Sequence, residues 1–311
     1  MRKILFWNIL IVFLLFCFFE LVVWAIQIYK TPEYLACTNC QKSIIHVCKE
    51  HREYAKYKFL KYKNFDEAYK DYYKKFFMEY VNSEYKKKPI VIFGCSFAQG
   101  WSINPDYSLS SLLHKLTKRP VYTRAYADYF SMAQMLYQTK REDTYNEIEP
   151  PEHVIFVYIT DHLRRISLSH PDMFFPFPYL RYKLNKNNIL EEEKFPFKYN
   201  FYTFRQYTIW KEQFIKQEEK EKLMYEFFVQ SKNELDKHWN NYQFTILVYE
   251  NNEQENQIWK NLEKKEFKIV YVDELLKSSV IDEKYTINDC WHPNEKAWET
   301  ITPQLIDILK L

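Results

Sequence analysis

The stretch PIVIFGCSFAQG, residues 89–100, contains the only two glycines of the 311-residue chain, Gly94 and Gly100. At an average usage of roughly 7%, a chain of this length would carry about 22 glycines. Glycine tolerates positive φ angles and close approach of the backbone. A chain that omits glycine elsewhere is therefore expected to need these two residues around the serine between them, Ser96.

The residues before and after this serine predict how its hydroxyl is presented. The apolar run 90–93 is typical of a buried parallel strand, and a helical pattern begins soon after Ser96. A strand, a sharp turn, a serine and a helix place a hydroxyl at the carboxyl edge of an α/β sheet. The alternative is an ordinary turn between a strand and a helix, with a serine that caps the helix.

Strands and helices alternate through the rest of the chain. We expect strands at 89–93, 120–127, 153–159, 244–249 and 267–272. Helices are expected at 109–116, 131–139, 253–264 and 295–309, the last broken by Pro303. This alternation predicts βαβ units and a parallel sheet. Between the third and fourth strands, an insertion at about 167–239 is expected to form a lid, a substrate wall or a solvated helical arm.

The N-terminus carries a nearly unbroken apolar run from residue 4 to residue 28. A helix of that length is about 37 Å long, enough to span a bilayer. Arg2 and Lys3 favour a cytoplasmic N-terminus and an extracytoplasmic domain, periplasmic or at the cell surface. The sequence therefore predicts a single-pass anchor at 1–30, a juxtamembrane segment at 31–87 with one or two amphipathic helices, and an α/β domain at 88–311. The lipid bilayer is the partner expected for residues 4–28.

Cysteines and charge define two further expectations. Cys37, Cys40, Cys48 and His51 form CxxC followed by CxxH, a spacing that suits a small zinc site. A disulfide between two of these cysteines, or free thiols, are the alternatives. The chain has 44 Lys and Arg against 41 Asp and Glu, a formal net charge of +3, which gives no indication of nucleic acid as a partner.

A second chemical motif lies directly before the last helix. The stretch NDCWHPN, residues 288–294, carries Asp289 and His292 on one short loop. An aspartate that accepts a hydrogen bond from one imidazole nitrogen leaves the other nitrogen basic and aimed at a hydroxyl. With Ser96, these residues make a Ser, Asp, His set in an order that nucleophilic catalysis can use.

The two motifs together resemble the SGNH/GDSL hydrolases. GCSFAQG is similar to the first block of that family, G-x-S-x-x-x-G, and DCWHP is similar to its last block, D-x-x-H-P. The resemblance covers residues 89 to about 310 without the insertion. It implies a three-layer α/β/α sandwich with a flavodoxin-like parallel sheet of about five strands. It also implies Ser96 as nucleophile, His292 as general base and Asp289 as its orienting partner, with no cofactor.

The middle blocks of the family differ here. The second block normally supplies a glycine N–H to the oxyanion hole, and the third an asparagine; this chain has neither. Oxyanion or substrate contacts would then come from Gly94, Ala127, Asp128, Thr160, Asp161, His162 or Arg164. The alternative for Asp161 is a purely structural ion pair with Arg164 or Arg165. Cys95 is expected to be a small core residue.

Two functions follow from this pattern. The first is a serine esterase or acyl-transfer enzyme acting on ester-linked acyl groups, such as acetyl groups of envelope carbohydrate. Its acceptor would be water or a sugar hydroxyl. The second is a catalytically degenerate member of the fold that binds glycan or partner proteins in an envelope assembly.

Overall fold

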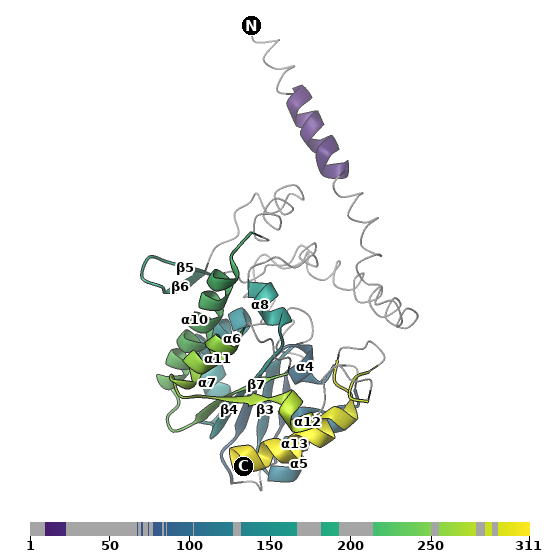
Figure 1. Cartoon of the computed structure of the whole chain (residues 1–311), viewed down its shortest axis with the longest axis vertical. Coiled ribbons are helices and arrows are strands. Elements are labelled where there is room, and N and C mark those ends of the chain that lie inside the picture. The colour runs from purple at the N-terminus through teal and green to yellow at the C-terminus, as the bar shows by residue number, and fades with distance from the viewer. Residues whose placement is uncertain are drawn as a thin grey trace.

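The structure is a computed structural model that shows a mixed α/β domain, preceded in the chain by an N-terminal helix at residues 10–22 (Figure 1). It describes residues 10–22, 67, 70, 74, 77–82, 84, 86–101, 103–126, 132–166, 182–192, 214–249, 255–277, 284–287 and 292–311, without the side chain of Arg164. The residues of the predicted zinc site lie outside this set, as does most of the predicted juxtamembrane segment.

A six-stranded sheet forms the centre of the domain, in the order β1-β3-β2-β4-β7-β8. All neighbouring strands are parallel except β1, which pairs antiparallel with β3. Without β1 the order is 2-1-3-4-5, the flavodoxin-like order expected from the resemblance. The strands are β1 Met78–Tyr80, β2 Ile90–Gly94, β3 Val121–Ala125, β4 His153–Tyr158, β7 Gln243–Val248 and β8 Phe267–Tyr271.

Helices cover both faces of this sheet (Figure 1). On one face, α13 (Glu295–Leu309) packs on α5 (Leu109–Thr117) and on α12 (Val272–Leu276). On the other face, α10 (Gln217–Asp236) packs on α6 (Met132–Thr139), α8 (Asp161–Ile166) and α11 (Asn256–Glu263). Helix α7 (Glu142–Glu147) follows α6. The predicted break at Pro303 is wrong, because α13 continues through this proline.

Helix α10 lies in the predicted insertion at about 167–239, for which a solvated helical arm was one of the expected structures. It buries Met224, Phe227 and Phe228, and the Phe228 ring packs edge-on against Phe156 of β4, with the ring centroids 5.2 Å apart. In the connection from β4 to the parallel strand β7, α10 is the helix that directly precedes β7. Before it, β5 (Tyr182–Leu184) and β6 (Leu190–Glu192) form a hairpin, and the Leu190 N–H donates to Gln230 of α10.

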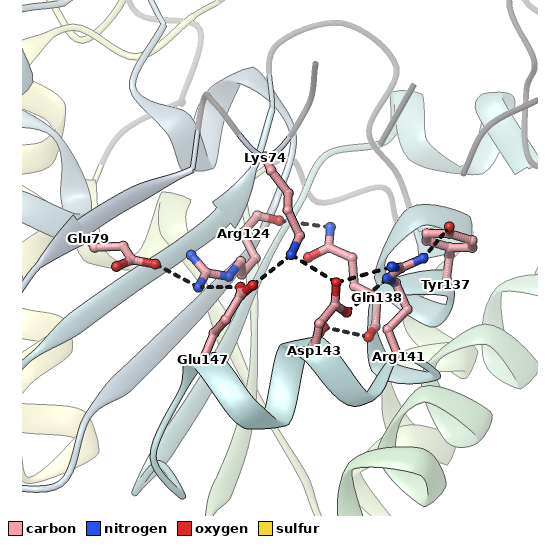
Figure 2. Close-up of polar contacts among 9 residues, drawn as sticks. Lys74, Glu79, Arg124, Tyr137, Gln138, Arg141, Asp143 and Glu147 are labelled. Carbon is pink, nitrogen blue, oxygen red and sulfur yellow. Dashed lines mark hydrogen bonds and ion pairs between the residues drawn. The ribbon is translucent and has the colours of Figure 1, made fainter. Parts of the chain in front are cut away.

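Strand β1 adds residues before position 88 to the sheet, and an ion pair fixes its position (Figure 2). The Arg124 side chain on β3 is only 2% exposed; its guanidinium lies 2.8 Å from the Glu79 carboxylate of β1 and 3.6 Å from Glu147 of α7. Its guanidinium also lies over the ring of Phe77, 5.0 Å from the ring centroid. A buried cation needs such partners.

Lys74 extends this cluster to α7 (Figure 2). Its ammonium lies 2.6 Å from Glu147 and 2.8 Å from Asp143, which Arg141 also contacts at 2.9 Å. Burial alone would raise the pKa of Asp143, but the hydrogen bonds from Arg141 and Lys74 outweigh burial and lower this pKa to about 2. These contacts connect the segment before the sheet to the α/β domain.

The membrane anchor predicted at residues 4–28 is not supported. The described part of this run forms a helix at residues 10–22. Among the described residues, none of the helices combines the length and the apolar character needed to cross a membrane. This finding contradicts the predicted single-pass localisation with an extracytoplasmic domain, and the bilayer is withdrawn as a partner.

Candidate active site

The turn after β2 requires glycine at position 94. Gly94 has φ +148°, and a Cβ atom added to it would lie 2.8 Å from the Cβ of Ala98 and 3.1 Å from the main-chain oxygen of Val157. This close approach lets the chain turn at once into the short helix α4 (Ser96–Gln99), whose first residue is Ser96. Ser96 is 7% exposed and lies at the carboxyl edge of the parallel sheet, the edge at which α/β proteins bind ligands.

Gly100 ends α4 in the left-handed conformation, with φ +74°. A Cβ atom here would lie 2.8 Å from the Cβ of Ser108. The reversal brings Trp101 back toward the nucleophile, and the Trp101 N–H donates to the Ser96 carbonyl at 3.0 Å. Both glycines singled out in the sequence therefore shape the same turn.

The loop before α13 places the histidine. Thr286 and Pro293 form an antiparallel bridge, and the Ile287 N–H donates to the His292 carbonyl at 2.9 Å. Asn294 then caps α13, because its side-chain oxygen accepts from the Ala297 N–H at 3.0 Å. Its amide nitrogen donates back to the carbonyl of Thr286 at 3.1 Å. The loop backbone is thus held on both sides of His292.

The fold brings Ser96 and His292 together although 196 positions separate them in the sequence. The Nε2 atom of His292 lies 2.9 Å from the Oγ atom of Ser96. With the neutral tautomer that leaves Nε2 unprotonated, the serine hydroxyl donates to the imidazole, the geometry that a general base needs to accept its proton. Asp289, the predicted orienting residue, lies outside the described residues and stays a prediction.

Two aromatic rings contact the imidazole. The ring centroids of Phe97 and Trp101 each lie 4.9 Å from that of His292, with interplanar angles of 39° and 52°. Sequence reasoning missed both residues. The available signal was their placement, one residue after the serine and one after Gly100, but no pattern indicates that these rings meet a histidine near the other end of the chain.

The residues predicted to contact the oxyanion or substrate occupy different environments in the structure. Thr160 lies two residues after Tyr158, the last residue of β4, and is half-buried. His162 is fully buried; its Nδ1 accepts from the Ile159 N–H at 3.4 Å, and its ring lies against Phe156 and Tyr158. Its ring therefore belongs to the core. Ala127, Asp128 and the side chain of Arg164 lie outside what the structure describes.

Asp161 forms a structural ion pair, the alternative to a role in the site that the sequence left open. The Nε atom of Arg165 donates to its carboxylate at 2.6 Å, and the Asp161 side chain is 6% exposed. Asp161 begins α8, the helix after β4, and β4 is a direct neighbour of β2, the strand that precedes Cys95. Burial raises the pKa of Cys95, which is fully buried. A raised pKa favours the protonated thiol, which is the less nucleophilic form of cysteine.

Among the described residues, no group of three or more His, Cys, Asp or Glu is placed to hold a metal ion. The zinc site predicted at Cys37, Cys40, Cys48 and His51 lies outside these residues and stays a prediction.

Comparisons with known proteins return matches among solved structures. No protein-family model matches the chain, and no curated protein matches it. A lipolytic protein of the G-D-S-L family from Veillonella parvula DSM 2008 shares 10% identity over 71% of this chain and 98% of its own, with a TM-score of 0.44. An acetyl xylan esterase from the rumen bacterium Butyrivibrio proteoclasticus shares 11% identity over 74% of this chain and 65% of its own, with a TM-score of 0.43.

A third similar structure is a carbohydrate esterase whose active site is described as having divergent catalytic and non-catalytic binding functions. It shares 13% identity over 74% of this chain and 69% of its own, with a TM-score of 0.47. The predicted resemblance to the SGNH/GDSL hydrolases is thereby confirmed as a resemblance. At such low identity, these similarities do not assign a reaction to this chain.

Proposed function

We propose that this protein is a serine esterase or acyl-transfer enzyme in which Ser96 is the nucleophile and His292 the general base. The observation that carries the proposal is the 2.9 Å distance between His292 Nε2 and Ser96 Oγ. It is supported by two glycines that the turn needs sterically, and by the position of the pair at the carboxyl edge of the sheet.

The reaction follows from this pair. The Ser96 hydroxyl transfers its proton to His292 Nε2 as its Oγ atom bonds to the ester carbonyl carbon, and a tetrahedral oxyanion forms. The oxyanion collapses and the C–O bond to the alcohol breaks, while the alcohol oxygen takes the proton from His292. An acyl group then remains on Ser96. A second hydroxyl compound gives its proton to His292 as its oxygen attacks the acyl carbon, and a second tetrahedral oxyanion forms. This oxyanion collapses, the bond from the acyl carbon to Ser96 Oγ breaks, and Ser96 Oγ takes the proton back from His292.

The acceptor in the second half-reaction sets the outcome. Water gives hydrolysis, and a sugar hydroxyl gives acyl transfer with the same residues. We propose ester-linked acyl groups of carbohydrate, acetyl groups in particular, as the substrate class.

For the oxyanion, Thr160 is the described candidate whose side chain can donate. An ionised Asp161 paired with Arg165 only accepts hydrogen bonds, and His162 is in the core. We therefore assign a supporting role to the Thr160 hydroxyl and keep the backbone N–H groups of Ala127 and Asp128 as proposed donors. Removal of one oxyanion donor typically costs about 10²–10³ in rate.

The test is turnover of an acetyl ester by the full chain and its Ser96→Ala and His292→Ala variants. We expect each substitution to lower kcat by about 10³ or more, because the two residues act as a unit. Undiminished turnover by Ser96→Ala would refute the assignment of the nucleophile. Thermal unfolding of each variant controls for loss of the fold.

The Asp161–Arg165 pair favours a second candidate, a binding module without turnover. In this candidate, the third block carries Asp161 where the family has an asparagine. The Asp161 carboxylate serves a structural ion pair with Arg165 in place of an oxyanion contact. Binding of acetylated oligosaccharide by a wild-type protein that neither turns over esters nor labels at Ser96 would select this candidate.

A further inference from the structure

Trp101 connects the nucleophile and the base through two different parts of one residue. Its main-chain N–H donates to the carbonyl of Ser96 at 3.0 Å, and its indole ring contacts the imidazole of His292 at 4.9 Å between centroids. Aromatic pairs are attractive at centroid separations of about 4.5–7 Å. The tilt of 52° between the planes lies in the ordinary range of such contacts.

Trp101 directly follows the turn that ends α4. Gly100 is left-handed in this turn, with φ +74°, and a Cβ atom on it would lie 2.8 Å from the Cβ of Ser108. The indole is therefore attached to the nucleophile turn itself and not to a separate loop. A ring held there restricts where the imidazole can lie relative to Ser96.

The described hydrogen bonds of the His292 loop act on its backbone, so a contact with the imidazole ring adds a constraint on the side chain. The bridge between Thr286 and Pro293 and the bond from Ile287 to His292 hold the backbone only. The side-chain torsions that aim Nε2 at the hydroxyl depend on contacts of the ring itself, which include those with Phe97 and Trp101. A misplacement of about 1 Å can cost about 10² in rate.

We propose, on the basis of the function proposed above, that Trp101 is a positioning residue that holds the His292 ring against Ser96. It acts through the histidine and does not contact the reacting atoms. Phe97 contacts the same imidazole, but it is 1% exposed and also packs edge-on against Tyr249, with ring centroids 5.0 Å apart. Substitution of Phe97 would disturb the core. Trp101 is half-buried, so its substitution is expected to leave the fold intact.

The test compares Trp101→Leu with Trp101→Phe in the full chain. Leucine keeps an apolar side chain without a ring, whereas phenylalanine restores a ring. The readouts are kcat and KM for an acetyl ester and the rate at which Ser96 reacts with a small fluorophosphonate. Tyr107→Leu is the matched control. Tyr107 is a half-buried aromatic residue of η3 (Pro105–Tyr107), with no ring contact to His292 among the described residues.

For Trp101→Leu we expect kcat and the fluorophosphonate rate to fall about 10- to 100-fold, with KM changed less than about 3-fold. Trp101→Phe should recover most of both rates, and Tyr107→Leu should leave them unchanged. A rise of KM with an unchanged fluorophosphonate rate would show a substrate contact instead and overturn the inference. Equal losses for leucine and phenylalanine would also overturn it. Failure of wild type to react at all would refute the proposed function itself.

Discussion

Gly94 allows the nucleophile turn because it has no side chain. A Cβ atom there would press on Ala98 one helical turn ahead and on the carbonyl of Val157 in the neighbouring strand. The first contact involves a side chain and the second involves backbone, so only the first can be removed by mutation. The positive φ of +148° adds strain for any other residue.

Gly94→Ala is therefore expected to lower the free energy of unfolding by about 2–4 kcal/mol and to lower the reactivity of Ser96. Urea unfolding and the fluorophosphonate rate measure the two effects. Gly94→Ala combined with Ala98→Gly removes the 2.8 Å contact and should recover part of the stability only. An alanine at 94 that leaves both quantities unchanged would contradict the steric account of the turn.

The charge cluster around Arg124 connects β1 and α7, two elements far apart in the sequence. Arg124 is almost fully buried, whereas its partners Glu79 and Glu147 are 49% and 41% exposed. Solvent around the exposed carboxylates weakens these ion pairs. A buried guanidinium that loses both carboxylates is still desolvated, however, and no longer has an opposite charge to offset that cost. This asymmetry makes the cluster a constraint on the position of β1.

Glu79→Gln with Glu147→Gln should lower the free energy of unfolding by about 1–2 kcal/mol, less at high salt. Glu142→Gln is the matched control. Glu142 is exposed on α7 and belongs to none of these pairs. Urea unfolding of the full chain at low and high ionic strength measures the difference. An equal effect of Glu142→Gln would contradict the role of the cluster.

Individual elements differ in how well the sequence predicts them. The five parallel strands and helix α13 fall within one or two residues of their expected positions, because buried strands are continuous apolar runs with clear limits. Strand β1 was missed, since its three residues, two half-buried and one exposed, are too few to show an alternating pattern. Helix α10 was assigned to an insertion because its charged face conceals a narrow apolar face, and only packing reveals that face.

The candidate site shows the same division. Ser96 and His292 were predicted, because each lies in a short motif whose chemistry is local. The contacts of Trp101 and Phe97 with His292 depend on how the first and last parts of the domain fold together, and no local pattern records them. The anchor prediction rested on the length of an apolar run, but none of the helices among the described residues has the length and apolar character that a membrane crossing requires.

The α/β domain as a unit should respond to acid through His153. This residue begins β4 and is 5% exposed; burial lowers its pKa from 6.5 to about 4, with a smaller opposing effect of Glu152. Between about pH 6.5 and pH 4 the unfolded chain binds a proton that the folded domain excludes. The contribution of the neutral His153 to stability is therefore present above pH 6.5 and lost as the pH falls toward 4.

His153→Gln should make the free energy of unfolding depend less on pH in this window, by up to a few kcal/mol across it. Urea unfolding of wild type and variant at several pH values between 4 and 7 gives the difference. Parallel curves for the two proteins would contradict the assignment.

The account as a whole depends on an activated serine. The most direct measurement is covalent labelling of the full-length chain by a fluorophosphonate, with Ser96→Ala, His292→Ala and Asp289→Asn beside wild type. We predict labelling of wild type, none of Ser96→Ala, and a rate lower by at least about 10² for His292→Ala. A folded wild type that does not label, or a His292→Ala variant that labels as fast as wild type, would contradict the proposed enzyme.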